Sequence, residues 1–130
     1  ISKELHVDDR IEFMGYVENR RDMLRMLKSS HLFCLPSSVE GFGIVTIEAM
    51  ASGIPYVNSD ISATREITDG GKGGLLFKIG NSEELSKKII NLLTNKKAYD
   101  KKVKEANKFA KQFDVSQIAD QLNSIYCSLK

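Results

Sequence analysis

Two glutamates, Glu40 and Glu48, are separated by seven residues and are the side chains of this sequence best placed to do chemistry. Between them, Gly41 and Gly43 permit backbone conformations and close approaches that a side chain would forbid. A helical pattern follows Gly43, and the first turn of a helix has unbonded N–H groups and a partial positive charge. The spacing therefore predicts a phosphate site between two carboxylates.

The loop that carries these residues lies between a predicted strand and a predicted helix. The apolar run at 32–35 ends in a proline, which is typical of a buried strand entering a loop. From Ile44 the apolar residues recur at steps of three and four, until a Gly-Ile-Pro sequence ends the helix. The first-turn N–H groups belong to Ile44, Val45 and Thr46, which we predict to bind phosphate.

The two carboxylates have different predicted partners. Glu48 lies about one turn into the helix, and helical side chains lean toward the N-terminus, so its carboxylate points back at the phosphate site. A carboxylate beside a diphosphate is favourable if it accepts hydrogen bonds from hydroxyls, and a ribose diol supplies them. Glu40 lies on the other side of Gly41, Phe42 and Gly43, where a donor sugar with its own hydroxyls would lie. This pattern predicts a nucleotide-sugar site.

Glu40 and Glu48 around Gly-Phe-Gly, followed by Ala-Met-Ala-Ser-Gly-Ile-Pro, resemble the signature of the retaining family 4 (group 1) glycosyltransferases. The resemblance runs from about Asp9 to the C-terminus. It lies in the nucleotide-binding C-terminal half of their twin-Rossmann (GT-B) architecture. It implies that Glu40 is catalytic and contacts the transferred sugar, and that Glu48 contacts the ribose. It also implies metal-independent transfer from a nucleoside-diphosphate sugar to an acceptor such as a lipid-linked or polysaccharide glycan.

The motifs of this sequence match other nucleotide-related functions less well. A phosphorylase or a nucleotide-sugar epimerase would share the twin-Rossmann plan, and a noncatalytic nucleotide-binding module could retain the motif for stability or assembly. The run Gly70–Gly74 contains a lysine but lacks the Ser or Thr of a phosphate loop and precedes a strand, so it predicts a flexible turn. The Gly-Phe-Gly loop lacks the third glycine of a dinucleotide fingerprint, so a nicotinamide site is not predicted.

Composition favours one ordinary globular domain. The 130 residues are 42% hydrophobic and 28% charged, and the formal net charge of +2 does not indicate nucleic-acid binding. No apolar run approaches the roughly 20 residues that cross a bilayer. Cys34 and Cys127 lie in a predicted strand and a predicted helix, which favours reduced thiols in a cytoplasmic protein. His6 and His31 have no partner at metal-ligand spacing, so neither a metal nor a cofactor is predicted.

The segment before the central motif predicts a strand and a helix. Residues 11–14 alternate in polarity and stop at Gly15, which suits a strand. The family resemblance implies that the nucleotide base lies near the following turn, so Gly15, Tyr16 and Val17 are candidate base contacts. The alternative is an ordinary strand-to-helix loop. Residues 19–30 then form a predicted helix with a methionine-rich apolar stripe typical of a core.

After the central motif, strands are predicted at 55–58 and 75–77. The resemblance implies a structural role for Glu66, which precedes an Asp-Gly turn and would orient the loop facing the donor site. Asn81 and the glutamate three residues later predict a capping box. Ser116 is a predicted cap for a last helix, which in the family packs toward the partner domain.

A lysine-rich helix precedes that last helix. It contains seven lysines at 96, 97, 101, 102, 104, 108 and 111. A solvated face is the simplest interpretation. The alternative is attraction to anionic lipid, which would make the protein peripheral to the membrane.

Four strands alternating with helices predict an α/β fold with a Rossmann-like parallel sheet of about four strands and flanking helices. The resemblance implies that residues 1–130 are a single partial domain, the donor-binding half. The first two strands and the N-terminal acceptor domain have no counterpart here. In the order 3-2-1-4-5-6 the strand at 11–14 would then lack a neighbour and the strand at 32–35 would have an open edge. We expect either chain upstream of Ile1 or a nonstandard repair of the pairing, and no turnover by this chain alone.

Overall fold

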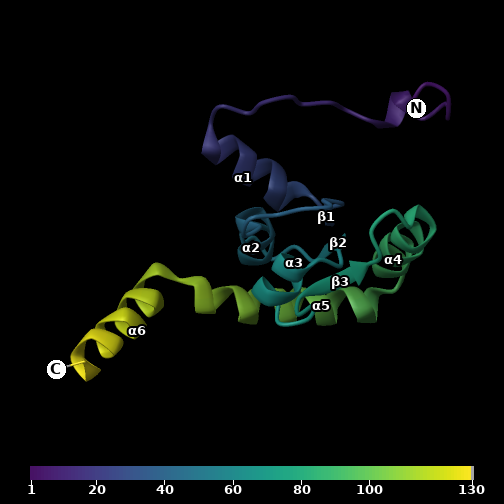
Figure 1. Ribbon diagram of the computed structural model, residues 1–130. Coiled ribbons are helices and arrows are strands. Elements are labelled where there is room, and N and C mark those ends of the chain that lie inside the picture. The colour runs from purple at the N-terminus through teal and green to yellow at the C-terminus, as the bar shows by residue number, and fades with distance from the viewer. Residues whose placement is uncertain (130) are drawn as a thin grey trace.

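A computed structural model describes residues 1–129 and has an α/β fold built around a parallel sheet (Figure 1). The sheet has three strands in the order β1-β2-β3. Their bounds are Phe33–Leu35, Tyr56–Ser59 and Gly74–Phe77. The register pairs Phe33 with Tyr56 and Tyr56 with Gly74, so β2 is the central strand and is fully buried. The prediction of a parallel Rossmann-like sheet is confirmed, with three strands rather than four in the described chain.

Helices cover both faces of the sheet. On one face, α2 (Ile44–Ala51) and α5 (Lys96–Ala110) pack against β2 through Met50, Tyr56 and Ala106. On the other face, α4 (Ser82–Thr94) packs through Leu92 against Val57 and Phe77. Because alternate β2 residues point to opposite faces, both clusters pass through this strand. The core therefore anchors α2, the helix that carries the candidate site.

The remaining elements lie at the periphery. They are α1 (Arg20–Ser29), α3 (Ser62–Ile67), α6 (Val115–Ser128) and two short 3₁₀ turns, η1 (Asp8–Arg10) and η2 (Lys111–Phe113). In Figure 1, α1 lies beside α2, whereas α6 projects from the far end of α5. Apolar side chains of α6, among them Leu122 and Tyr126, are exposed.

The predicted strand at 11–14 is wrong. These residues have no regular structure, and Phe13 is 82% exposed. A strand requires a neighbour to satisfy its backbone N–H and C=O groups, and no strand among residues 1–129 lies beside this segment. The pairing is therefore not repaired in another way within the described chain. The predicted open edge is confirmed, because within residues 1–129 β1 pairs only with β2.

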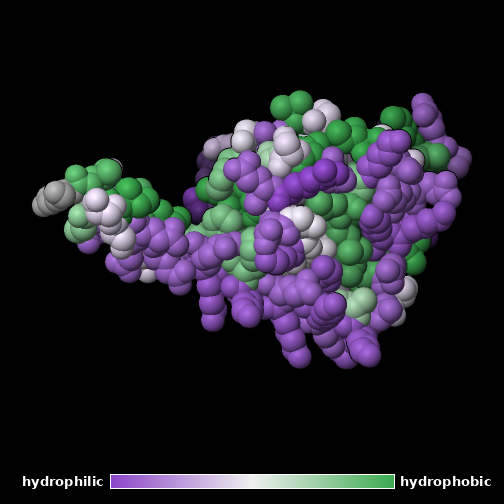
Figure 2. Space-filling view, turned by 60° about the horizontal axis from the view of Figure 1, so that its bottom comes forward, coloured by the Kyte–Doolittle hydropathy of each residue, from purple (hydrophilic) through white to green (hydrophobic). Residues whose placement is uncertain are grey.

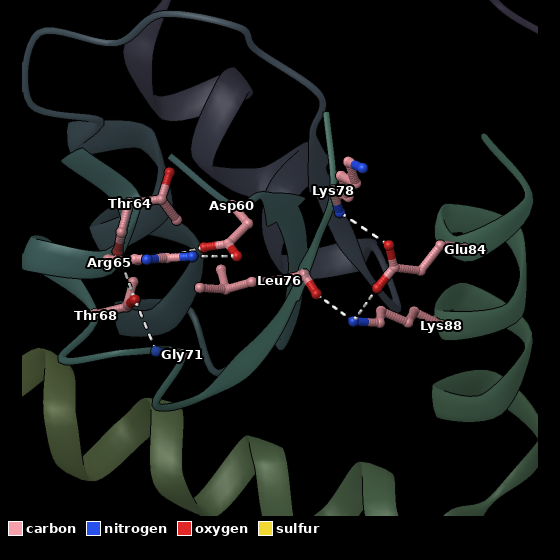
Figure 3. Close-up of polar contacts among 9 residues, drawn as sticks. All are labelled: Asp60, Thr64, Arg65, Thr68, Gly71, Leu76, Lys78, Glu84 and Lys88. Atoms are coloured by element: carbon pink, nitrogen blue, oxygen red, sulfur yellow. Dashed lines mark hydrogen bonds and ion pairs between the residues drawn. The ribbon is translucent and has the colours of Figure 1, made fainter. Parts of the chain in front are cut away.

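The N-terminal caps of α4 and α6 differ in part from the caps predicted from the sequence. Asn81 caps α4 as predicted, since its Oδ1 accepts a hydrogen bond from the Glu84 N–H at 2.9 Å. Glu84 does not complete the capping box, because its carboxylate accepts from the Lys78 N–H at 3.0 Å and pairs with Lys88 (Figure 3). The hydrogen bond from Lys88 lowers the pKa of Glu84. At α6 the cap is Asp114 rather than Ser116, whose N–H donates to the Asp114 side chain.

Candidate functional site

The loop 36–43 leads from the carboxyl end of β1 into α2, where ligands bind in open parallel sheets. Gly43 is the N-cap of α2 and has φ 82° and ψ 39°, a left-handed conformation that non-glycine residues rarely adopt. A Cβ there would also lie 3.1 Å from Ile67 Cδ1. Gly41 differs, because it has no positive φ and a Cβ there would meet open space. The fold thus requires glycine at 43 but not at 41.

This difference gives a paired test of the loop. Gly43→Ala is expected to lower the unfolding free energy by about 2 kcal/mol, from the left-handed conformation and the contact with Ile67. Gly41→Ala is expected to leave stability unchanged but to weaken nucleotide-sugar binding by about tenfold, since only a bound molecule would meet its methyl group. Thermal unfolding and calorimetric titration measure the two effects. If Gly41→Ala bound the sugar nucleotide normally, the loop would not approach the ligand closely.

The first turn of α2 presents unbonded N–H groups at this end of the sheet. Within residues 1–129 the Ile44 and Val45 N–H groups have no hydrogen-bond partner, and both residues are exposed. The Thr46 N–H is already engaged, because it donates to Gly43 O at 2.9 Å. Ile44 and Val45 are therefore the residues of the predicted trio that can offer N–H groups to an anion.

The Thr46 side chain belongs to the framework of the site. It is buried, and its Oγ1 accepts a hydrogen bond from Asn58 Nδ2 at 2.9 Å. Asn58 Oδ1 in turn accepts from the Leu35 N–H at 3.0 Å. Asn58, which is fully buried in β2, thereby joins the end of β1 to the first turn of α2. Asn58 was not among the site residues predicted from the sequence, although a polar side chain within an apolar strand is a signal that could have identified it.

Glu40 is half-buried, and its carboxylate is hydrogen-bonded to a residue of the same loop. Ser37 Oγ donates a hydrogen bond to Glu40 Oε1 at 2.7 Å. The second carboxylate oxygen has no partner among the described residues. The carboxylate is thus oriented yet keeps acceptor capacity for a hydroxyl or for developing positive charge.

Glu48 lies on the second turn of α2 and is paired with a residue of α1. Arg20 NH2 contacts Glu48 Oε1 at 2.6 Å, and the side chains are 72% and 14% exposed. Arg20 is the first residue of α1, whose N-cap Asn19 accepts from the Arg21 N–H at 2.9 Å. This ion pair was not predicted from the sequence, since its two residues lie 28 positions apart.

The three candidate base contacts immediately precede α1. Gly15 has φ 61°, Tyr16 is 88% exposed, and Val17 is half-buried. The Tyr16 ring is free to stack on another flat group, and α1 connects this segment to Glu48 through Arg20.

Several side-chain hydrogen bonds stabilise the segment after β2, which contains α3. Asp60 accepts two hydrogen bonds from Arg65, which lower the pKa of Asp60 (Figure 3). Buried Thr68 donates to Thr64 O at 2.5 Å and accepts from the Gly71 N–H at 3.1 Å. These bonds place α3 so that Ile67 lies against Gly43.

Glu66 lines an open hollow of about 990 Å³ that Phe42 of the loop and Ile67 of α3 also line. Its lining also includes residues of α5, η2 and α6, such as Phe109 and Phe113. The wall carries both signs of charge, including Asp69 and Lys72.

Residues 70–73 of the glycine run form a turn before β3, as predicted, and Gly74 is the first residue of β3. Gly73 has φ 79°, and a Cβ there would lie 2.7 Å from Ala106 Cα. A Cβ on Gly74 would lie 2.5 Å from the Tyr56 ring. Packing against α5 and β2 accounts for these two glycines without a ligand. Within residues 1–129 no group of three or more His, Cys, Asp or Glu side chains is arranged to hold a metal ion.

The fold and the loop between β1 and α2 are those of a known protein family. A family described as Glycosyl transferases group 1 matches residues 1–112, and the chain belongs to this family.

Among curated relatives, the chain is 31% identical to N-acetyl-alpha-D-glucosaminyl L-malate synthase of Bacillus anthracis, over 95% of the chain and 32% of that protein. It is 33% identical to a phosphatidyl-myo-inositol mannosyltransferase of Mycobacterium leprae, over 91% of the chain and 32% of that protein. The chain thus spans about a third of the length of these relatives.

Among solved structures, HepE of Anabaena in complex with UDP-glucose superposes with a TM-score of 0.84 at 27% identity. The match covers 98% of the chain and 35% of HepE. Sucrose-phosphate synthase of Thermosynechococcus elongatus has a TM-score of 0.82 at 26% identity, over 98% of the chain and 32% of that enzyme.

Proposed function

We propose that this chain supplies the donor-binding part of a retaining glycosyltransferase, which transfers a sugar from a nucleoside-diphosphate sugar to an acceptor such as a lipid-linked or polysaccharide glycan. The observation that carries the proposal is the arrangement of Glu40 and Glu48 about the unbonded N–H groups of Ile44 and Val45. Family membership and the UDP-glucose complex of HepE support a nucleotide-sugar donor.

Each group has a defined role in this proposal. The N–H groups of Ile44 and Val45 bind the diphosphate, with Gly41, Phe42 and Gly43 allowing its close approach. Glu40 orients the sugar and stabilises positive charge at its anomeric carbon. Glu48 accepts hydrogen bonds from the ribose, and Gly15, Tyr16 and Val17 form the base site. No metal ion takes part in this scheme.

Binding the negatively charged donor requires more positive charge than the N-terminus of α2 supplies. A diphosphate carries about two negative charges, whereas a helix N-terminus supplies about half a positive charge. We propose that an N-terminal acceptor domain and cationic residues outside residues 1–130 complete the site. The chain alone is then expected to bind donor weakly and not to turn it over.

Titrating the complete protein with UDP, GDP and ADP sugars, followed by product analysis, tests the function. Transfer to an acceptor with retained anomeric configuration supports it. Dependence on inorganic phosphate would identify a phosphorylase instead, and interconversion of the free donor would identify an epimerase. Tight binding without any turnover would indicate a noncatalytic nucleotide-binding module.

We also propose that the lysine-rich surface of α5 and the start of η2 attaches the protein to anionic membranes from the cytoplasmic side. Lysines 97, 101, 104, 108 and 111 recur at steps of four and three, so they form one stripe about 21 Å long. Within residues 1–129, Lys97, Lys104, Lys108 and Lys111 have no carboxylate partner within ion-pair distance. In Figure 2, where the α5 side is turned to the front, hydrophilic residues form a continuous band. No helix in the described chain has the length and hydrophobicity to cross a bilayer.

Vesicle binding tests this surface. Lys101→Glu combined with Lys104→Glu is expected to weaken binding to vesicles containing phosphatidylserine by at least tenfold, since each lysine near an anionic surface contributes about 1 kcal/mol. The matched control is Lys87→Glu on α4, where the lysine is exposed and paired with Glu83. Equal binding of wild-type protein to neutral and anionic vesicles would instead show that the stripe is only a solvated surface.

A further inference from the structure

The ion pair between Arg20 and Glu48 joins two helices at the candidate donor site. The residues are 28 positions apart, and the contact is 2.6 Å. Glu48 is 14% exposed, so its carboxylate is largely removed from water, whereas the Arg20 side chain is 72% exposed. Arg20 therefore contacts Glu48 through one end of its guanidinium group and leaves most of that group accessible.

A carboxylate next to a diphosphate site creates an electrostatic conflict. Both groups are negative, and repulsion between them would oppose binding of the same nucleotide that the carboxylate is proposed to hold. Arg20 resolves this conflict, because its positive charge offsets that of Glu48. The pair occupies Oε1, and Oε2 keeps its lone pairs for a ribose hydroxyl. A guanidinium has five N–H donors and the ion pair uses one of them.

We propose that Arg20 is a positioning residue for the donor. It holds the Glu48 carboxylate in the orientation that accepts the ribose hydroxyls and neutralises its charge, so that the diphosphate can bind at the nearby N-terminus of α2. This inference rests on the proposed function, because it assigns a partner to the ribose-binding glutamate.

The two residues should respond differently to the number of phosphates. Glu48 interacts with the ribose, which is common to a nucleoside, its monophosphate and its diphosphate. Its removal should weaken all three, the diphosphate least, because the unpaired positive charge of Arg20 would then attract the phosphates. Arg20 compensates charge, so its removal should matter more as phosphates are added. A purely structural contribution of Arg20 to α1 would instead affect all three ligands alike.

The experiment titrates the complete protein by calorimetry with the nucleoside, monophosphate and diphosphate of the base that binds best among uracil, guanine and adenine. Arg20→Ala is expected to weaken diphosphate binding by roughly five- to tenfold and nucleoside binding by no more than roughly twofold. Glu48→Ala is expected to weaken nucleoside binding by roughly tenfold and diphosphate binding by a smaller factor, because Arg20 is then unpaired. Arg20→Lys should recover most of the diphosphate affinity, because it retains the charge but loses the planar contact.

Two further variants complete the test. In the double variant Arg20→Ala with Glu48→Ala, the loss of diphosphate affinity should be smaller than the product of the single losses, because no unneutralised carboxylate remains. Arg21→Ala is the matched control, since Arg21 adjoins Arg20 on α1 and forms no ion pair within residues 1–129. Its binding should equal that of the wild type.

The outcomes separate this inference from the proposed function. If the wild-type protein bound none of the nucleoside diphosphates, the proposed function itself would fail. If it bound them and Arg20→Ala bound the diphosphate equally well or more tightly, Arg20 would merely block Glu48 and the inference would be overturned. An equal loss for all three ligands in Arg20→Ala would also overturn it.

Discussion

Replacing Glu40 with alanine or glutamine in the complete protein is expected to lower kcat by about 100-fold while changing the donor KM little. Stabilisation of charge that develops only in the transition state acts on the rate rather than on ground-state binding, and losing one such group typically costs about 10²–10³ in kcat. The structure supports this role, because Ser37 orients the half-buried carboxylate and leaves one oxygen without a partner in the described chain. Steady-state kinetics with varied donor measure both parameters.

Glu48→Ala is the matched comparison for this experiment. It should raise the donor KM by roughly fivefold with a smaller effect on kcat, since a ribose contact binds the ground state and the transition state alike and the unpaired Arg20 offsets part of the loss. Ser37→Ala should show a weaker form of the Glu40 effect, because the carboxylate remains but is less well oriented. Equal effects on KM alone from both glutamate variants would contradict the assigned roles.

Asn58→Ala is expected to lower the unfolding free energy by about 3 kcal/mol and the melting temperature by about 10 °C. The substitution leaves the Leu35 N–H without its acceptor, removes the donor to Thr46 Oγ1 and opens a cavity beside a fully buried strand. Since these bonds join β1 to α2, the donor KM should also rise. Thermal unfolding followed by circular dichroism measures the stability.

The adjacent residue of β2 is the control. Ser59 is also buried, but its Oγ has no hydrogen-bond partner in the described chain. Removing an unsatisfied buried hydroxyl relieves a desolvation cost, so Ser59→Ala should leave stability unchanged or raise it by about 1 kcal/mol. Comparable destabilisation by both substitutions would mean that burial alone, rather than the Asn58 bonds, determines the effect.

Features that depend on residues close in sequence were predicted well. The strand at 33–35, the glycine loop and α2 follow one another within 19 residues, and each has a local signal in apolar spacing or glycine. The Asn81 cap is equally local. The segment at 11–14 has the polarity pattern of a strand, yet it forms none. Strand formation depends on a neighbour elsewhere in space, which polarity alternation cannot reveal.

The candidate site likewise has features set by neighbouring residues and features set by long-range contacts. The sequence by itself determined the spacing of Glu40 and Glu48 and the helix start between them, because both are set by contiguous residues. Only the tertiary structure decided that Arg20 forms an ion pair with Glu48, that hydrogen bonds of Asn58 link α2 to β1, and that Gly43 but not Gly41 is required by the fold. These contacts join segments that packing around β2 brings together. Local periodicity in the sequence does not reveal which residues will meet in this way.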